Sequence, residues 1–79
     1  MKLMAFYRND RNDDLNIMID SDYTSKKAFS DDIRANGYRV VGVANKEELK
    51  NPELIKNNKF YNVLSDYGFS DLLDYFESH

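Results

Sequence analysis

The sequence predicts a small α+β domain: a three-stranded antiparallel or mixed sheet with short C-terminal helices packed on it. Two apolar runs near the start, residues 2–8 and 15–20, have the composition of strands. A helical segment then leads into a third, valine-rich run at residues 38–44. The length of 79 residues suits one domain, so we expect a single domain over residues 1–79.

The first two strands are predicted to form a hairpin. Residues 2–8 carry apolar and aromatic side chains on both faces, as a central strand would. Residues 9–14 are all polar and predict the turn. In the second run Leu15, Ile17 and Ile19 alternate with other residues, so they share one face of the sheet.

A helix is expected between the second and third strands. Thr24 or Ser25 can cap its start, and Gly37 can end it in the left-handed conformation. Phe29 and Ile33 lie four residues apart and give the helix an apolar stripe. A right-handed crossover makes the second and third strands parallel, with the first strand antiparallel between them, so the predicted strand order is 2-1-3.

Two further signals lie around the end of the third strand. Gly42 interrupts the valine run, which predicts a bulge or a site of close packing. Asn45 with Glu48 three residues later is a capping-box pattern, and it predicts a short helix over residues 46–50.

The remaining chain predicts more short helices. Pro52 suits the first position of a helix in which Leu54 and Ile55 would face inward. Ser70 can cap a last helix. The spacing of four apolar residues gives that helix an amphipathic stripe: Phe69, Leu72, Leu73 and Phe76.

The segment from Tyr23 to Ala44 resembles small accessory proteins encoded by phages and mobile elements of Gram-positive bacteria. The likeness is carried by the Lys-Lys-x-Phe run at residues 26–29 and the Arg-Ala-Asn-Gly-Tyr-x-Val run at residues 34–40. Those proteins are mostly of unassigned function. The resemblance therefore implies a biological context and no mechanism.

We predict no catalytic, cofactor or metal site, and we expect the chain not to be an enzyme. Cysteine is absent and His79 is the single histidine, which excludes thiolate sites and a histidine-based zinc site within the chain. The glycines are isolated, so no loop is suited to cradle a phosphate. Residues 20–24 echo the start of a calcium loop, but Ser25 and Asp31 stand where that loop needs Gly and Glu.

Charge is distributed unevenly along the chain, whose net charge is −3. Residues 33–59 are rich in lysine and arginine, whereas residues 60–79 contain acidic residues and neither lysine nor arginine. The basic segment supports an alternative function, nucleic-acid binding. Its candidate residues are Arg34, Arg39, Lys46 and Lys50. Nucleic-acid-binding domains are usually basic overall, so this remains the second hypothesis.

The acidic segment is the leading candidate for a partner-binding surface. Asp71, Asp74 and Glu77 are spaced to lie on one face of the last helix, while Tyr67 and Tyr75 are side chains of the kind that anchor interfaces. We predict a non-enzymatic accessory protein that binds another protein through this acidic and aromatic surface. The other interpretation is a solvated helix face with its tyrosines in the core.

The N-terminal apolar run is too short for a signal peptide, and no run approaches the ~20 apolar residues of a membrane span. We therefore expect a cytoplasmic protein without a membrane partner and without a cofactor. Small chains that lack disulfides and metals often gain stability from a second subunit. A homodimer is thus an open alternative.

Overall fold

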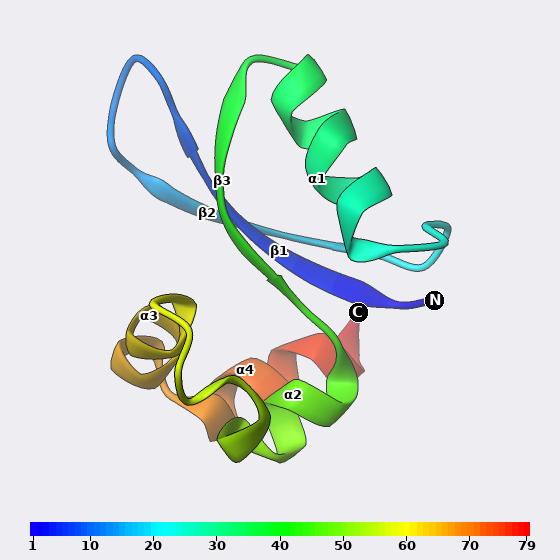
Figure 1. Cartoon of the computed structure of the whole chain (residues 1–79), viewed down its shortest axis with the longest axis vertical. Helices are drawn as coiled ribbons and strands as arrows, with labels where there is room; N and C mark the ends of the chain where they lie inside the picture. The colour runs from blue at the N-terminus through cyan, green and yellow to red at the C-terminus, as the bar shows by residue number, and fades with distance from the viewer. The chain divides into compact units, whose positions relative to one another are not determined.

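The computed structural model describes residues 1–79, and the chain divides into two compact units, Met1–Ala44 and Asn45–His79. The first unit contains the sheet and one helix, and the second contains helices only (Figure 1).

The three strands are β1 (Leu3–Asn9), β2 (Leu15–Asp20) and β3 (Tyr38–Ala44). Their order in the sheet is β2-β1-β3, and β1 is antiparallel to both neighbours. This confirms the predicted topology. The central strand is also the most buried: residues 3–6 have no exposed surface, as expected from apolar side chains on both faces.

One face of the sheet packs against α1 (Lys26–Ala35). Leu3 and Ala5 of β1 form a buried cluster with Phe29 and Ile33 of α1. Partly buried side chains pack around this cluster: Tyr7, Tyr23, Tyr38, Val40 and Val43. The predicted apolar stripe of α1 is therefore its contact with the sheet.

The other face of the sheet is apolar as well. The register pairs Ile19 with Met4 and Ile17 with Phe6, which places these side chains on the face away from α1. Leu15 shares this face, so the predicted alternation in β2 is confirmed.

A β-bulge interrupts the pairing of β1 with β3. Tyr7 pairs with Val40 and Phe6 with Gly42, so β3 holds one extra residue at this point. Because the extra residue shifts the alternation of side chains, Val40 and Val43 both pack on the cluster beneath α1. The glycine in the valine run thus marked a bulge.

Helix α1 begins and ends as its sequence predicts. The Ser25 hydroxyl accepts a hydrogen bond from the backbone N–H of Ala28 at 3.1 Å, so Ser25 rather than Thr24 is the cap. Gly37 follows the helix with a φ of 89°. An L side chain is strained at this φ, so glycine suits the position.

The second unit has four helical elements. They are α2 (Lys46–Lys50), the 3₁₀ helix η1 (Pro52–Ile55), α3 (Phe60–Tyr67) and α4 (Phe69–Ser78). The predicted capping box is present: Asn45 N–H donates to Glu48 Oε1 at 3.0 Å, and Glu48 N–H donates to Asn45 Oδ1 at 2.9 Å. Pro52 occupies the start of η1, as expected.

The prediction that Leu54 faces inward is wrong. Its side chain is 60% exposed, whereas that of Ile55 is 9% exposed. A 3₁₀ helix has three residues per turn, so adjacent side chains point in clearly different directions and only one of the two is buried.

Ser70 is not the cap of the last helix. Helix α4 begins at Phe69, and Gly68, with a φ of 106°, joins it to α3. The Gly68 N–H donates to the Leu64 carbonyl, and the Gly68 carbonyl accepts from Leu72 N–H. Because one glycine both ends α3 and starts α4, Ser70 already lies inside the helix. The amphipathic pattern of α4 is confirmed, with Leu72 among its buried residues.

Candidate protein interface

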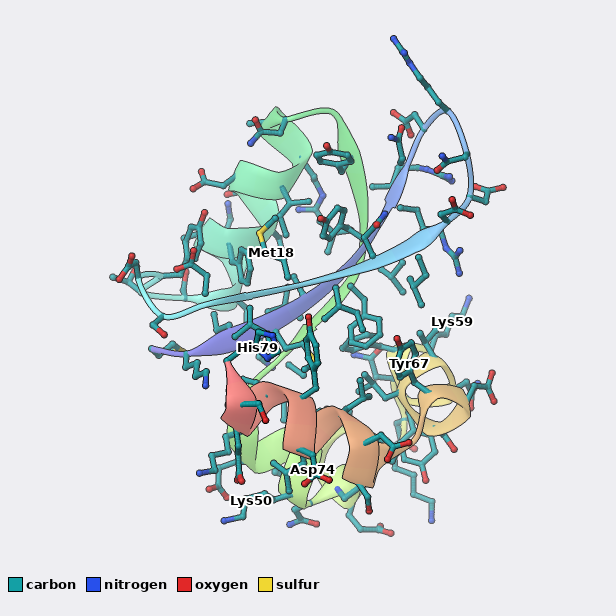
Figure 2. All side chains as sticks on the ribbon, turned by 180° about the vertical axis from the view of Figure 1, so that it is seen from behind. Met18, Lys50, Lys59, Tyr67, Asp74 and His79 are labelled. Atoms are coloured by element: carbon teal, nitrogen blue, oxygen red, sulfur yellow. The ribbon has the colours of Figure 1, made fainter.

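The predicted partner-binding residues are all exposed, and all belong to the second unit. We call the five of them the acidic–aromatic surface: Tyr67 at the end of α3 and Asp71, Asp74, Tyr75 and Glu77 on α4. Tyr67 is 52% exposed and Tyr75 is 41% exposed, so neither belongs to the core. Figure 2 labels Tyr67 and Asp74 on their two helices.

The carboxylates of this surface differ in their surroundings. Glu77 forms an ion pair with Lys46 of α2 at 3.5 Å. The carboxylates of Asp71 and Asp74 form no ion pair. The Ser78 hydroxyl donates to the backbone carbonyl of Asp74 at 2.8 Å and does not contact its carboxylate. The uncompensated negative charge of α4 is therefore concentrated at Asp71 and Asp74.

Tyr75 has an aromatic neighbour that the sequence did not indicate. Its ring centroid lies 4.1 Å from that of His79, and His79 Nδ1 lies 2.9 Å from the Tyr75 carbonyl. His79, the residue after the end of α4, therefore packs its ring against that of Tyr75, four residues earlier in the chain. Part of the Tyr75 ring remains open to solvent.

The basic residues proposed for nucleic-acid binding are divided between the two units. Arg34 and Arg39 lie in the first unit, and Lys46 and Lys50 in the second. Three of them are paired with carboxylates of their own unit: Arg34 with Asp31 at 3.6 Å, Arg39 with Asp10 at 3.0 Å and Asp13 at 2.5 Å, and Lys46 with Glu77 at 3.5 Å.

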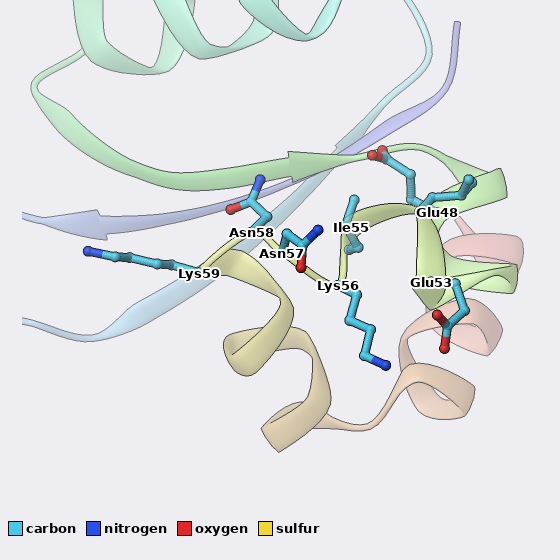
Figure 3. A pocket seen from close by; sticks show the side chains of 8 residues that line it. Glu48, Glu53, Ile55, Lys56, Asn57, Asn58 and Lys59 are labelled. Carbon is cyan, nitrogen blue, oxygen red and sulfur yellow. The ribbon is translucent and has the colours of Figure 1, made fainter.

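A wide depression of about 600 Å³ runs along η1 and the loop after it. Figure 3 shows Lys56 and Lys59 pointing away from one another, with Glu48 on another side. Ligand sites usually place a few polar groups so that they converge on one point. The side chains of this depression do not converge, so it offers no defined site.

A second pocket, of about 340 Å³, lies in the first unit between α1 and the sheet. We call it the Tyr23–Asp32 pocket. Its lining residues come from four separate parts of the chain: Met18 of β2, Tyr23 of the following loop, Asp32 and Ile33 of α1 with Asn36 at its C-cap, and Tyr38 of β3. No pattern in the sequence brought these residues together, because they meet only when α1 packs on the sheet.

Hydrogen bonds hold the polar rim of this pocket. The Tyr23 hydroxyl donates to Asp32 Oδ2 at 2.7 Å, and the Asn36 side-chain amide donates to the Asp32 backbone carbonyl at 2.8 Å. The Tyr23 ring stacks on Phe29, with centroids 4.5 Å apart. Tyr23 is therefore held both by its ring and by its hydroxyl.

The pKa of Tyr23 is raised to about 12. The hydrogen bond to Asp32 is the largest cause, followed by desolvation and by the negative charges of Asp32, Asp20 and Asp22. The tyrosine thus remains a neutral donor through the physiological range.

No group of three or more histidine, cysteine, aspartate or glutamate side chains is placed to hold a metal ion. None of the helices combines the length and the apolar character that crossing a membrane requires. No family model, no curated protein and no solved structure matches the chain.

Proposed function

We propose that the chain is a non-enzymatic accessory protein that binds another protein through the acidic–aromatic surface. The observation that supports this most is the exposure of Tyr75, 41%, on the same side of α4 as two unpaired carboxylates. Tyr75 directly follows Asp74 and lies one helical turn beyond Asp71, so the ring and these charges can contact one partner together.

The charge of this surface favours a basic partner. Two unpaired carboxylates on one helix face attract a positively charged surface and steer its approach. They also repel phosphate, and three of the four basic residues considered for nucleic-acid binding, Arg34, Arg39 and Lys46, form ion pairs. These features support protein binding over nucleic-acid binding.

Self-association through this surface is less favourable than binding a different protein. In a two-fold homodimer the same patch meets itself, so Asp71 and Asp74 of the two copies would approach each other. The proposed partner is therefore a different, basic protein. The proposed location is the cytoplasm, and the resemblance of residues 23–44 supports a phage or mobile-element context.

A site-specific crosslinking experiment tests the proposal. A photo-crosslinking amino acid replaces Tyr75 in the full chain, and crosslinked proteins are identified from host cells by mass spectrometry. The same amino acid at Leu54, which is 60% exposed in the same unit, is the matched control. We expect a crosslinked basic protein from position 75 and not from position 54.

Charge reversal then tests the acidic part of the surface. Asp71→Lys with Asp74→Lys is expected to reduce the crosslink and the affinity for the purified partner by roughly tenfold. Glu53→Lys, a single charge reversal at an exposed carboxylate on η1, should leave both unchanged, and each single variant, Asp71→Lys or Asp74→Lys, is compared with it directly. Glu77 is left intact because of its ion pair with Lys46. Equal crosslinking from both positions, or equal binding by all variants, contradicts the proposal.

A further inference from the structure

We propose that the Tyr23–Asp32 pocket binds a guanidinium group, the side-chain group of arginine. This site lies in the first unit and is independent of the acidic–aromatic surface. The pocket has a volume of about 340 Å³, within the range of small-ligand pockets.

The polar groups of the pocket are acceptors that still have capacity. Asp32 uses Oδ2 to accept from Tyr23, so Oδ1 can accept further donors. Asn36 donates through its amide nitrogen to the Asp32 backbone carbonyl, and its side-chain oxygen remains as an acceptor. A ligand that offers several N–H donors in one plane fits this set, and guanidinium offers five.

The apolar part of the pocket suits a flat cation. Tyr23 and Tyr38 line it, and cations are attracted to the faces of such rings. Ile33, which is 4% exposed, lies among the lining residues, and Met18, which is 38% exposed, contributes a polarizable thioether. Figure 2 shows the sulfur of Met18 beside α1. Guanidinium stacks on aromatic rings and is more weakly hydrated than an ammonium group.

The charges around the pocket complement a cation. Asp32 lines it, Asp20 and Asp22 act on the same tyrosine, and no lysine or arginine is among the lining residues. The nearby Arg34 is paired with Asp31, and so is Lys27, at 2.7 Å. The N-terminal amine donates to the Tyr23 backbone carbonyl at 2.7 Å, and Met1 does not line the pocket. A carboxylate that faces a guanidinium forms a charge-assisted hydrogen bond, which adds both strength and geometry.

Nuclear magnetic resonance titration of the full chain tests the site. The probes are a capped Gly-Arg-Gly peptide, the same peptide with citrulline, the same peptide with lysine, and free arginine. The arginine peptide should shift the Met18 methyl signal and the Tyr38 ring signals. Its dissociation constant should be on the order of 1 mM, the scale of a single anchoring group. Citrulline has the same shape without the charge, so its peptide should cause no shift.

Two substitutions on α1 form a matched pair. Asp32→Asn removes the charge while an amide oxygen can still accept from Tyr23, and it should weaken arginine-peptide binding roughly tenfold. Asp31→Asn makes the same change one residue away, outside the pocket, and should leave binding unchanged. Both side chains are exposed, so the fold should tolerate either change.

The remaining outcomes are decisive. Three outcomes would overturn the proposal that this pocket binds guanidinium. They are no shifts with the arginine peptide, equal shifts with the citrulline peptide, and an equal loss of binding in both variants. Equal binding of the lysine peptide overturns the assignment to guanidinium. Tighter binding of the capped peptide than of free arginine identifies the source as a protein side chain, and the reverse order identifies a free small molecule; both support the site.

Discussion

Tyr23 is the residue whose chemistry departs most clearly from that of an isolated side chain. Its pKa is raised from 10.0 to about 12, mainly by the hydrogen bond to Asp32. The folded chain thus holds the Tyr23 proton more tightly than the unfolded chain does. This difference stabilises the fold, and the contribution is fully present below pH 10. That contribution is lost as the pH rises from 10 to about 12, because the unfolded chain releases the proton first.

We therefore expect one of the six tyrosines to ionise about two pH units later than a free tyrosine, as measured by phenolate absorbance. Tyr23→Phe should remove this late component, and Asp32→Asn should move it back toward pH 10. Tyr38→Phe is the control, because it removes a neighbouring phenol and should leave the late component in place. Ionisation of all six tyrosines near pH 10 would contradict the hydrogen bond.

Ser25 shows how a single cap supports a helix. The first turn of α1 contains no acidic residue, and two lysines, Lys26 and Lys27, open the helix where positive charge is unfavourable. The Ser25 side chain satisfies the Ala28 N–H that would otherwise lack a partner in the helix. Ser25→Ala is thus expected to lower the free energy of unfolding by about 1 kcal/mol.

Urea denaturation of the full chain measures this loss, and two variants serve as comparisons. Ser25→Asp should keep the cap and add a favourable charge at the helix start, so its stability should equal or exceed that of the original chain. Ser30→Ala, within α1, should cost little, since alanine has the higher helix propensity. A loss at position 30 as large as that at position 25 would refute the role of the cap.

The elements that sequence reasoning identified correctly are those with a local cause. The capping box at Asn45, the glycine stop at Gly37 and the bulge beside Gly42 each depend on neighbouring residues in the chain. Leu54 and Ser70 were misjudged because their roles depend on where a helix starts and on its type. The apolar character of Leu54 and the capping ability of Ser70 determine neither the first residue of a helix nor its type.

The two candidate sites differ in the same way. The acidic–aromatic surface lies on two consecutive helices, so the spacing of Asp71, Asp74 and Glu77 was enough to indicate it. The Tyr23–Asp32 pocket required the crossover that places α1 on the sheet, and no periodicity links residue 18 to residue 38. An acidic stretch around Tyr23 was its only signal in the sequence, and turn and cap residues explained that stretch equally well.

At the scale of the whole molecule, the charge segregation seen in the sequence is reduced in space. Within their own units, Arg34, Arg39 and Lys46 each form an ion pair with a carboxylate, so their charges are compensated locally. Solvent-exposed pairs of this kind contribute little stability each. On α4 only Glu77 is paired, so Asp71 and Asp74 are the least compensated charges of that helix.

The second unit is expected not to keep its helices as an isolated peptide of residues 45–79. Its α-helices have 5, 8 and 10 residues, and isolated helices shorter than about 12–15 residues are marginal in water. The peptide is also shorter than the roughly 40 residues below which chains rarely fold without disulfides, metals or partners.

Circular dichroism of the peptide should show low helix content in buffer and a marked gain in trifluoroethanol, whereas the full chain should be helical in buffer. A peptide already helical in buffer would contradict this expectation. If the peptide is unfolded, Tyr67 and Tyr75 have no fixed spacing from Asp71 and Asp74 in it, so only the full chain can serve as bait for the proposed partner.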